Sequence, residues 1–201
     1  MMTQFKPLPP EFYARDTHMV AQELLGKIMV RRWRNKILSG RITEVESYVG
    51  EDDDACHAAR GVTARTKIMY GPAGHAYIYL IYGMYYCMNI ATERTGFPAA
   101  VLIRSLAPAA GIATMKKLRR TTKLHNLTTG PGKLTQALQI TRSLRGEDLT
   151  HSHHLFVVDD GYPVTSHDIT TSPRIGVDYA KHCALYPWRY YLKDSDFISR
   201  K

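Results

Sequence analysis

Hydrophobic and polar residues alternate along residues 37–49 (ILSGRITEVESYV), which is the pattern of a β-strand with one buried face. A shorter alternating run at 27–34 comes before it and ends at Asn35, so the two runs predict a β-hairpin. A period of two places four residues on one face of the second strand, Ile42, Glu44, Glu46 and Tyr48. We therefore expect two carboxylates and an aromatic ring side by side on this strand.

Two more strand-like runs, 75–82 and 85–92, are separated by a Gly-Met pair and predict a second β-hairpin. Stretches rich in β-branched and aromatic residues predict further strands at 99–106, 154–158 and 187–193. The sheet is therefore expected to be built mainly from antiparallel neighbours.

Helices are expected at 17–25, 108–120 and 130–140. The first has Asp16 or Thr17 as its N-cap candidate and a glycine at its end, and the third follows a Gly-Pro turn. Because hairpins dominate and helices interrupt them, the sequence predicts a mixed α/β (α+β) fold with an antiparallel sheet. We find no internal repeat and no linker, and we expect one compact domain over residues 1–201, with 1–12 as a loose N-terminal segment.

Charge is distributed unevenly along this chain. Lys and Arg total 27 against 18 Asp and Glu, a formal net charge of +9. Between Glu93 and Glu147 there are ten basic residues and no acidic one, whereas six acids fall within residues 44–54. A long basic span beside an acidic centre indicates a polyanionic partner, either nucleic acid or an anionic membrane surface. The alternative is that both are ordinary solvated faces.

Three cysteines without a CxxC motif argue against a disulfide scaffold and against a zinc finger, so we expect reduced thiols. The longest apolar stretch, 76–91, contains many tyrosines and is shorter than the roughly 20 residues that span a bilayer. The N-terminus lacks the pattern of a secretory signal. The sequence thus predicts a soluble cytoplasmic protein without a membrane partner.

Six of the 13 tyrosines lie between residues 70 and 86. In the predicted hairpin Tyr77 and Tyr79 share a face, and Tyr82 lies near the tip. Such rings stack on nucleobases, and an aromatic residue at a tip can enter a duplex as a wedge. The alternative is a sheet core that uses tyrosine for its strand propensity.

The pair Glu44 and Glu46 beside Tyr48 suggests a general base, because burial and a neighbouring like charge raise the proton affinity of a carboxylate. An exposed edge strand with ordinary surface acids is the alternative. Residues 51–57 (EDDDACH) offer metal ligands, but their spacing matches neither an EF-hand nor a zinc deaminase. Residues 130–133 (GPGK) lack the Walker spacing, so they suggest at most a phosphate contact at a helix start.

Taken together, these motifs resemble the alkyladenine, or 3-methyladenine, DNA glycosylase family, the mammalian-type methylpurine enzymes that also occur in bacteria. The resemblance covers nearly the whole chain, from about residue 24 to 199. Its blocks, in order, are 42–48 (ITEVESY), 54–58 (DACHA), 74–79 (GHAYIY), 82–89 (YGMYYCMN), 101–104 (VLIR), 130–134 (GPGKL) and 173–177 (PRIGV). One block departs from the family, whose usual Thr-Pro-Arg-Asn is Thr-Ala-Arg-Thr at 63–66 in this chain.

The resemblance implies a fold with a curved antiparallel sheet, flanking helices and a protruding hairpin, and it implies a role for each matching residue. Glu46 corresponds to the carboxylate that activates the attacking water, and Arg104 to an arginine near the nucleotide and this water. The expected walls of a pocket for a flipped base are Tyr48, His57 and Tyr79, with Asn89 crowding the 2-amino group of guanine. The expected DNA contacts are Tyr82, which fills the vacated space, with Met84, Tyr85, Arg65 and Lys133.

The implied activity is hydrolysis of the N-glycosidic bond of damaged purines in double-stranded DNA: 3-methyladenine, 7-methylguanine, hypoxanthine and ethenoadenine. This would start base excision repair, in a bacterial cytoplasm at the nucleoid. We expect no metal, no cofactor and no obligate protein partner, and therefore a monomer. Two other functions stay open on the residues alone, a metal-dependent nuclease that uses 51–57 and an RNA-binding module that uses the tyrosine-rich hairpin.

Overall fold

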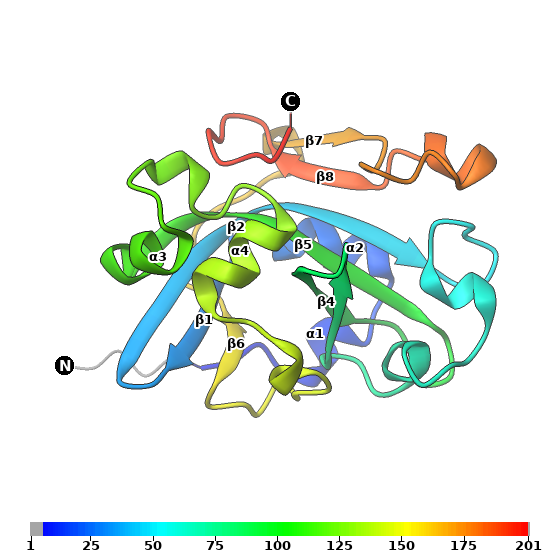
Figure 1. Cartoon of the computed structure of the whole chain (residues 1–201). Coiled ribbons are helices and arrows are strands. Elements are labelled where there is room, and N and C mark those ends of the chain that lie inside the picture. The colour runs from blue at the N-terminus through cyan, green and yellow to red at the C-terminus, as the bar shows by residue number, and fades with distance from the viewer. Residues whose placement is uncertain (1–5, 201) are drawn as a thin grey trace.

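Antiparallel strands form the framework of the chain, which a computed structural model describes from residue 6 to residue 200. The strands are β1 (Ile28–Trp33), β2 (Lys36–Val49), β3 (Ala76–Ile81), β4 (Tyr85–Ala91), β5 (Ala99–Ala110), β6 (Leu155–Val158), β7 (Ile169–Ser172) and β8 (Arg189–Leu192). Within residues 6–200 they make one eight-stranded sheet, in which β3-β4-β5-β2-β1-β6 are consecutive neighbours. The sheet does not close into a barrel in this part of the chain, and the predicted α+β fold is confirmed (Figure 1).

The long strand β2 has different neighbours along its two halves. Residues 36–41 pair with β1, whereas Glu44–Glu46 pair with β8 on the same edge, and β5 runs along the other edge. β7 joins the sheet only through β8. The part of β2 that carries both glutamates is therefore a central strand, and the alternative of an exposed edge strand is wrong.

Helices cover the sheet and connect its strands. The α-helices are α1 (Pro10–Tyr13), α2 (Thr17–Leu24), α3 (Ile112–Arg119) and α4 (Pro131–Leu138). The 3-10 helices are η1 (His57–Arg60), η2 (Thr66–Tyr70), η3 (Leu124–Asn126), η4 (Arg142–Leu144), η5 (Ser166–Asp168) and η6 (Lys181–Leu185). Asp16 caps α2, because its Oδ1 accepts hydrogen bonds from the backbone N–H groups of His18 and Met19, both at 2.9 Å.

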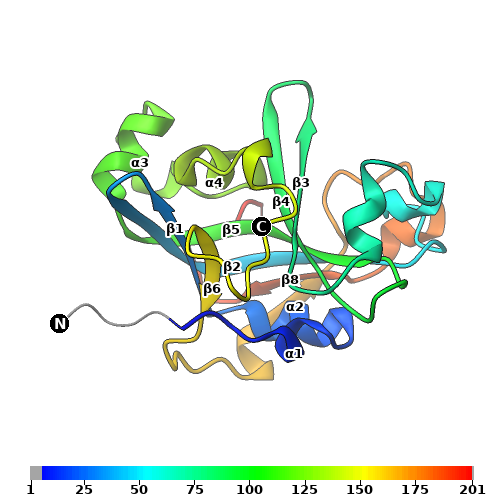
Figure 2. The same ribbon diagram turned by 90° about the horizontal axis from the view of Figure 1, so that it is seen from below.

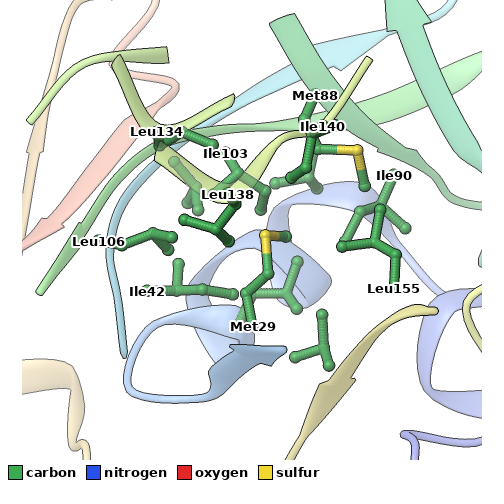
Figure 3. Packing of buried hydrophobic residues seen from close by; sticks show 14 of the residues in the cluster. Met29, Ile42, Met88, Ile90, Ile103, Leu106, Leu134, Leu138, Ile140 and Leu155 are labelled. Atoms are coloured by element: carbon green, nitrogen blue, oxygen red, sulfur yellow. The ribbon is translucent and has the colours of Figure 1, made fainter. Parts of the chain in front are cut away.

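The main hydrophobic core lies between the sheet and the helices α2 and α4 (Figure 3). Leu134 and Leu138 of α4 pack with Ile103 and Leu106 of β5, and Met29 of β1 belongs to the same cluster. Removing one such buried leucine side chain costs about 2–5 kcal/mol of stability. This packing fixes β2 and β5 relative to each other, and these are the strands that carry Glu46 and Arg104.

A double irregularity in the β2–β5 pairing changes the predicted faces of β2. The register passes from Ile42↔Leu106 to Glu44↔Ser105 and then to Val45↔Ile103, which leaves Thr43 and Arg104 without an opposite residue. Ile42 consequently turns into the hydrophobic core, together with Val45. The expectation that Ile42 shares a face with Glu44 and Glu46 is therefore wrong, since β-bulges shift the alternation by one residue.

Other differences concern the boundaries of elements. The helix expected from 108 begins only at Ile112, because 108–110 still belong to β5, and β7 was not predicted at all. Residues 1–5 of the segment expected to be loose lie outside the described residues. Farther along that segment, Leu8 is buried and its backbone N–H donates to the Val157 carbonyl at 2.8 Å, so this part packs on β6.

Candidate active site

Glu46 is a fully buried carboxylate that accepts three hydrogen bonds. Its Oε2 accepts from the Tyr48 hydroxyl at 2.8 Å and from Arg104 Nη1 at 3.0 Å. Its Oε1 accepts from the backbone N–H of Ile175 at 2.7 Å. A carboxylate has about four acceptor sites, so these three donors leave one site on Glu46 for a further donor such as a water molecule.

Arg104 connects Glu46 with the second carboxylate predicted on β2. Besides Glu46, its guanidinium binds Glu44, with Nε 3.2 Å from Oε1. Glu44 is also fully buried, and it accepts from Arg189 Nε at 2.7 Å and from the backbone N–H of Ser199 at 2.6 Å. Because Arg104 sits at the irregularity in β5, one side chain can reach both glutamates. Two arginines balance the charge of two carboxylates in this buried network.

A cavity of about 300 Å³ opens beside this network. This volume is at the lower end of the range for small-molecule sites, which suits a single flat ligand better than an extended one. Aromatic side chains form much of its wall, and predicted pocket residues are among its lining: Tyr48, His57, Tyr79, Asn89 and Arg104. The structure therefore brings these five residues together around one recess, with the Glu46 carboxylate bonded to two of them.

Two tyrosines of the cavity wall, Tyr48 and Tyr79, are neutral phenols. Burial raises the pKa of the Tyr48 hydroxyl, and Glu46 beside it acts in the same direction. Burial also raises the pKa of Tyr79. Both rings therefore remain uncharged at neutral pH and offer electron-rich faces, which attract a cationic ligand.

Arg174 supports Tyr48 from the side of the loop after β7. Its guanidinium carbon lies 4.8 Å from the centroid of the Tyr48 ring, and Nη1 and Nη2 bind both carboxylate oxygens of Asp53 at 2.6 and 2.7 Å. Both charged side chains of this pair are buried. Sequence reasoning singled out neither contact, although Arg174 belongs to the 173–177 block that contributed to the family resemblance.

His57 is held in one tautomer by its two neighbours. Arg65 Nη2 lies 3.1 Å from Nε2, and since an arginine only donates, Nε2 is the acceptor. Nδ1 therefore carries the hydrogen and donates to the Tyr77 hydroxyl at 2.8 Å. Burial, together with the positive charges of Arg65 and Arg60, lowers the pKa of His57 to about 4. The imidazole in the cavity wall is thus neutral at pH 7.

Residues 63–66, which depart from the family pattern, form a loop that hydrogen bonds between its two threonines hold together. Thr63 N–H donates to Thr66 Oγ1 at 2.8 Å, and Thr66 N–H donates to Thr63 Oγ1 at 3.1 Å. This reciprocal pair holds Arg65, whose guanidinium carbon lies 4.6 Å from the centroid of the Tyr79 ring. Arg65 therefore lies at the mouth of the cavity, against the wall residues His57 and Tyr79.

The hairpin β3–β4 projects from the sheet beyond the rest of the molecule (Figure 2). Tyr82 and Gly83 at its tip have positive φ angles of 53° and 69°, and the Met84 N–H closes the turn on the Ile81 carbonyl. Tyr82 is 81% exposed and also lines the cavity mouth, and Met84 is 66% exposed. The tip therefore presents two large apolar side chains, Tyr82 and Met84, to solvent.

The remaining two predicted DNA contacts are Tyr85, the first residue of β4 after the tip, and Lys133 of α4. Tyr85 is 43% exposed and packs against Gly132, where an added Cβ would come within 3.0 Å of it. Lys133 follows in the first turn of α4, and burial and Arg119 lower its pKa. Neither residue is among the described residues that line the cavity, whereas Pro131, at the start of α4, is.

The sequence model of the methylpurine-DNA glycosylase family matches residues 11–196 of this chain. The chain belongs to this family. A protein of Methanocella arvoryzae is 50% identical over 195 residues, which is 96% of both chains. One of Alkaliphilus oremlandii is 48% identical, covering 96% of this chain and 99% of the relative, and one of Legionella pneumophila (strain Lens) is 46% identical, covering 97% and 99%. All three are named "Putative 3-methyladenine DNA glycosylase".

As a member of the methylpurine-DNA glycosylase family, the chain is a DNA glycosylase, a hydrolase of N-glycosyl bonds that binds DNA. The buried carboxylate, the aromatic recess and the projecting hairpin all lie within the matched residues. No helix in residues 6–200 has the length and apolar character needed to cross a membrane.

The acidic run at 51–54 does not form one metal site. Glu51 accepts a hydrogen bond from the Tyr70 hydroxyl at 2.5 Å, Asp53 binds Arg174, and Asp54 lies 3.1 Å from Lys181 Nζ. These acids point to different partners, so the run does not provide the converging carboxylates that a metal-dependent nuclease of 51–57 would need.

Proposed function

We propose that this DNA glycosylase removes alkylated and deaminated purines from duplex DNA by rotating the damaged nucleotide into the cavity and hydrolysing its glycosidic bond. The substrates would be 3-methyladenine, 7-methylguanine, hypoxanthine and ethenoadenine. The observation that carries the proposal is the buried Glu46 carboxylate, bound by Arg104 and Tyr48 at the wall of an aromatic cavity.

The bond inside a stacked duplex is out of reach, and rotating the nucleotide outward costs a few kcal/mol. The exposed ring of Tyr82 would offset part of this cost by stacking in the gap. A purine alkylated at N3 or N7 is a cation, and the faces of Tyr48 and Tyr79 would attract it. The neutral lesions would rely on fit within the cavity and on protonation of the leaving base.

In the chemical step, the bond between the purine nitrogen and C1′ breaks, and its electron pair leaves with the base. The sugar becomes oxocarbenium-like, and the negative charge of Glu46 stabilises it. Water held at the remaining acceptor site of Glu46 then bonds to C1′ and passes a proton to the carboxylate. An alkylated purine leaves as a neutral molecule, so its departure needs no proton donor.

We further propose that the enzyme stops at the abasic site. Among the described residues that line the cavity there is no lysine, the side chain that would form a Schiff base with the sugar. The sugar-phosphate backbone would then stay intact until another activity cuts it.

The test is a base-release assay on duplex oligonucleotides that each carry one defined lesion, run in EDTA. The wild-type protein should release the damaged purine and leave the strand uncut until alkali is added. Glu46→Gln should bind lesion DNA but excise at least ~100-fold more slowly under single-turnover conditions. Glu23→Gln, at an exposed acid, is the matched control. Excision by Glu46→Gln at the wild-type rate would contradict the proposal.

A further inference from the structure

A second cluster of chemically active side chains lies away from Glu46. Asp54, in the loop after β2, and His182 and Cys183, in η6, each offer one ligand atom, and these three atoms lie within 4.8 Å of one another. Within residues 6–200, no other group of three His, Cys, Asp or Glu side chains has this spacing. The cluster joins two segments that are far apart in the sequence.

The spacing of the donors fits tetrahedral metal coordination. Cys183 Sγ and His182 Nε2 are 3.6 Å apart. In a tetrahedral zinc site with Zn–S of about 2.3 Å and Zn–N of about 2.0 Å, sulfur and nitrogen are separated by about 3.5 Å. The His182 ring is oriented by an edge contact with Tyr186, with the centroids 5.7 Å apart.

We propose that Asp54, His182 and Cys183 bind one zinc-class divalent cation, with water as the fourth ligand. A thiolate and an imidazole favour such borderline-soft ions over Mg²⁺ and Ca²⁺, which prefer oxygen. On binding, Cys183 loses its thiol proton to solvent. The resulting thiolate and the Asp54 carboxylate together balance the two positive charges, while His182 stays neutral.

The cation must replace existing contacts of two of its ligands. The Cys183 thiol lies 3.7 Å from the Asp52 carbonyl oxygen, and this weak hydrogen bond is lost when the thiol loses its proton. Lys181 Nζ lies 3.1 Å from Asp54 Oδ2, but the Lys181 side chain is 76% exposed, and exposed ion pairs contribute little to stability. His182 is exposed and Asp54 is half-buried, so an ion from solvent approaches from their side of the cluster. Displacing the Lys181 ammonium to water therefore costs little.

The bound cation would cross-link two segments that form one side of the base cavity. Ala55, next to Asp54, and Tyr179, before η6, both line that cavity. The carbonyl of Cys183 also accepts a hydrogen bond from Arg174 Nη2 at 3.1 Å. The ion would thus stabilise the wall that supports Tyr48 without taking part in hydrolysis, and base release would proceed in EDTA.

The test is a titration of the EDTA-treated, desalted full-length protein with Co²⁺. One equivalent should produce a thiolate-to-cobalt charge-transfer band together with the strong d–d bands of tetrahedral cobalt, and Zn²⁺ should abolish both. Cys183→Ala should lose the charge-transfer band, and His182→Ala and Asp54→Asn should weaken binding at least ~10-fold. Lys181→Ala should bind cobalt more tightly, because it removes the competing cation.

Cys56→Ala and His167→Ala are the matched controls, since neither residue belongs to the cluster, and both should give the wild-type spectrum. A charge-transfer band that survives in Cys183→Ala, or its absence from the wild-type protein, would overturn the proposal. If Cys183→Ala does not fold, unchanged affinity in both His182→Ala and Asp54→Asn would overturn it equally. The readout is spectroscopic, so it stands apart from the outcome of the base-release assay.

Discussion

Arg104 Nη1 lies 3.0 Å from Glu46 Oε2, and both side chains are shielded from solvent. Taking one partner out of such a buried pair leaves an uncompensated charge and costs about 3–5 kcal/mol. The same guanidinium binds Glu44 through Nε, so two carboxylates fix the orientation of Arg104. The orientation of the proposed catalytic carboxylate therefore depends on a second buried glutamate.

Glu44→Gln tests this dependence. The amide keeps the size of the side chain but removes the charge that fixes Arg104, so Arg104 and the water beside Glu46 lose their alignment. Single-turnover excision should fall by up to about 100-fold, the scale of a small misplacement in an active site. The dissociation constant for lesion DNA should change by less than about threefold.

Circular dichroism and thermal unfolding of Glu44→Gln will separate misalignment from loss of fold. Ser199→Ala is a milder variant, because its hydroxyl donates to Glu44 Oε1 at 2.8 Å while the backbone contact is retained. An excision rate equal to wild type in both variants would show that Glu44 does not position Arg104.

The strands and the hairpin were predictable because their alternation is local, but the bulge opposite Arg104 was not. No residue pattern around Thr43 indicates a shift of register there, because the shift follows from the pairing of β2 with both β5 and β8. For the same reason the sequence placed Ile42 beside the glutamates, whereas the structure turns it into the core.

The site shows a similar division. Glu46 and Tyr48 share a strand, so their proximity follows from a period of two. In the structure the Tyr48 hydroxyl lies 2.8 Å from Glu46 Oε2. The backbone N–H of Ile175 on Glu46 could not be foreseen, because backbone donors carry no residue signature. Arg174 and Asp53 likewise meet only through the tertiary fold.

Tyr82→Ser removes the exposed ring from the hairpin tip. If this ring fills the gap that a flipped nucleotide leaves, the flipped state should lose about 1–3 kcal/mol of stacking, which is a roughly 5- to 150-fold lower population. The measurement is the fluorescence change of a base analogue placed beside the lesion. Tyr162→Ser, another exposed tyrosine remote from the cavity, is the control, and an unchanged signal in Tyr82→Ser would remove the wedge role.

Stability should fall as the pH is lowered, because of His57. Its pKa is about 4 in the fold and near 6.5 in the unfolded chain, so between these values the unfolded state binds the extra proton. The free energy of unfolding should therefore rise with pH from about 4 to about 6.5 and lose its dependence on His57 above that window. Urea unfolding of wild type and His57→Gln at several pH values will measure the difference.

In that experiment His57→Gln should show a shallower slope than wild type across the same window. His18 also has a lowered pKa, mainly from burial, and contributes with the same sign in both proteins, so the difference between them isolates His57. The exposed His167→Gln should keep the wild-type slope. Identical slopes in wild type and His57→Gln would show that the imidazole is not desolvated.

Arg65→Ala should change which lesions are preferred. The guanidinium lies 4.6 Å from the Tyr79 ring and donates to His57, so it places a positive charge at the cavity mouth. A cationic base such as 7-methylguanine is repelled by this charge, whereas neutral hypoxanthine is not. Removing Arg65 should therefore raise the ratio of 7-methylguanine to hypoxanthine excision several-fold, even where both rates fall through weaker binding of DNA. Single-turnover rates at saturating enzyme give this ratio directly. Arg34→Ala, at an exposed arginine of the turn between β1 and β2 that does not line the cavity, serves as the control. A ratio that stays constant, or moves toward hypoxanthine, would show that Arg65 does not discriminate by charge.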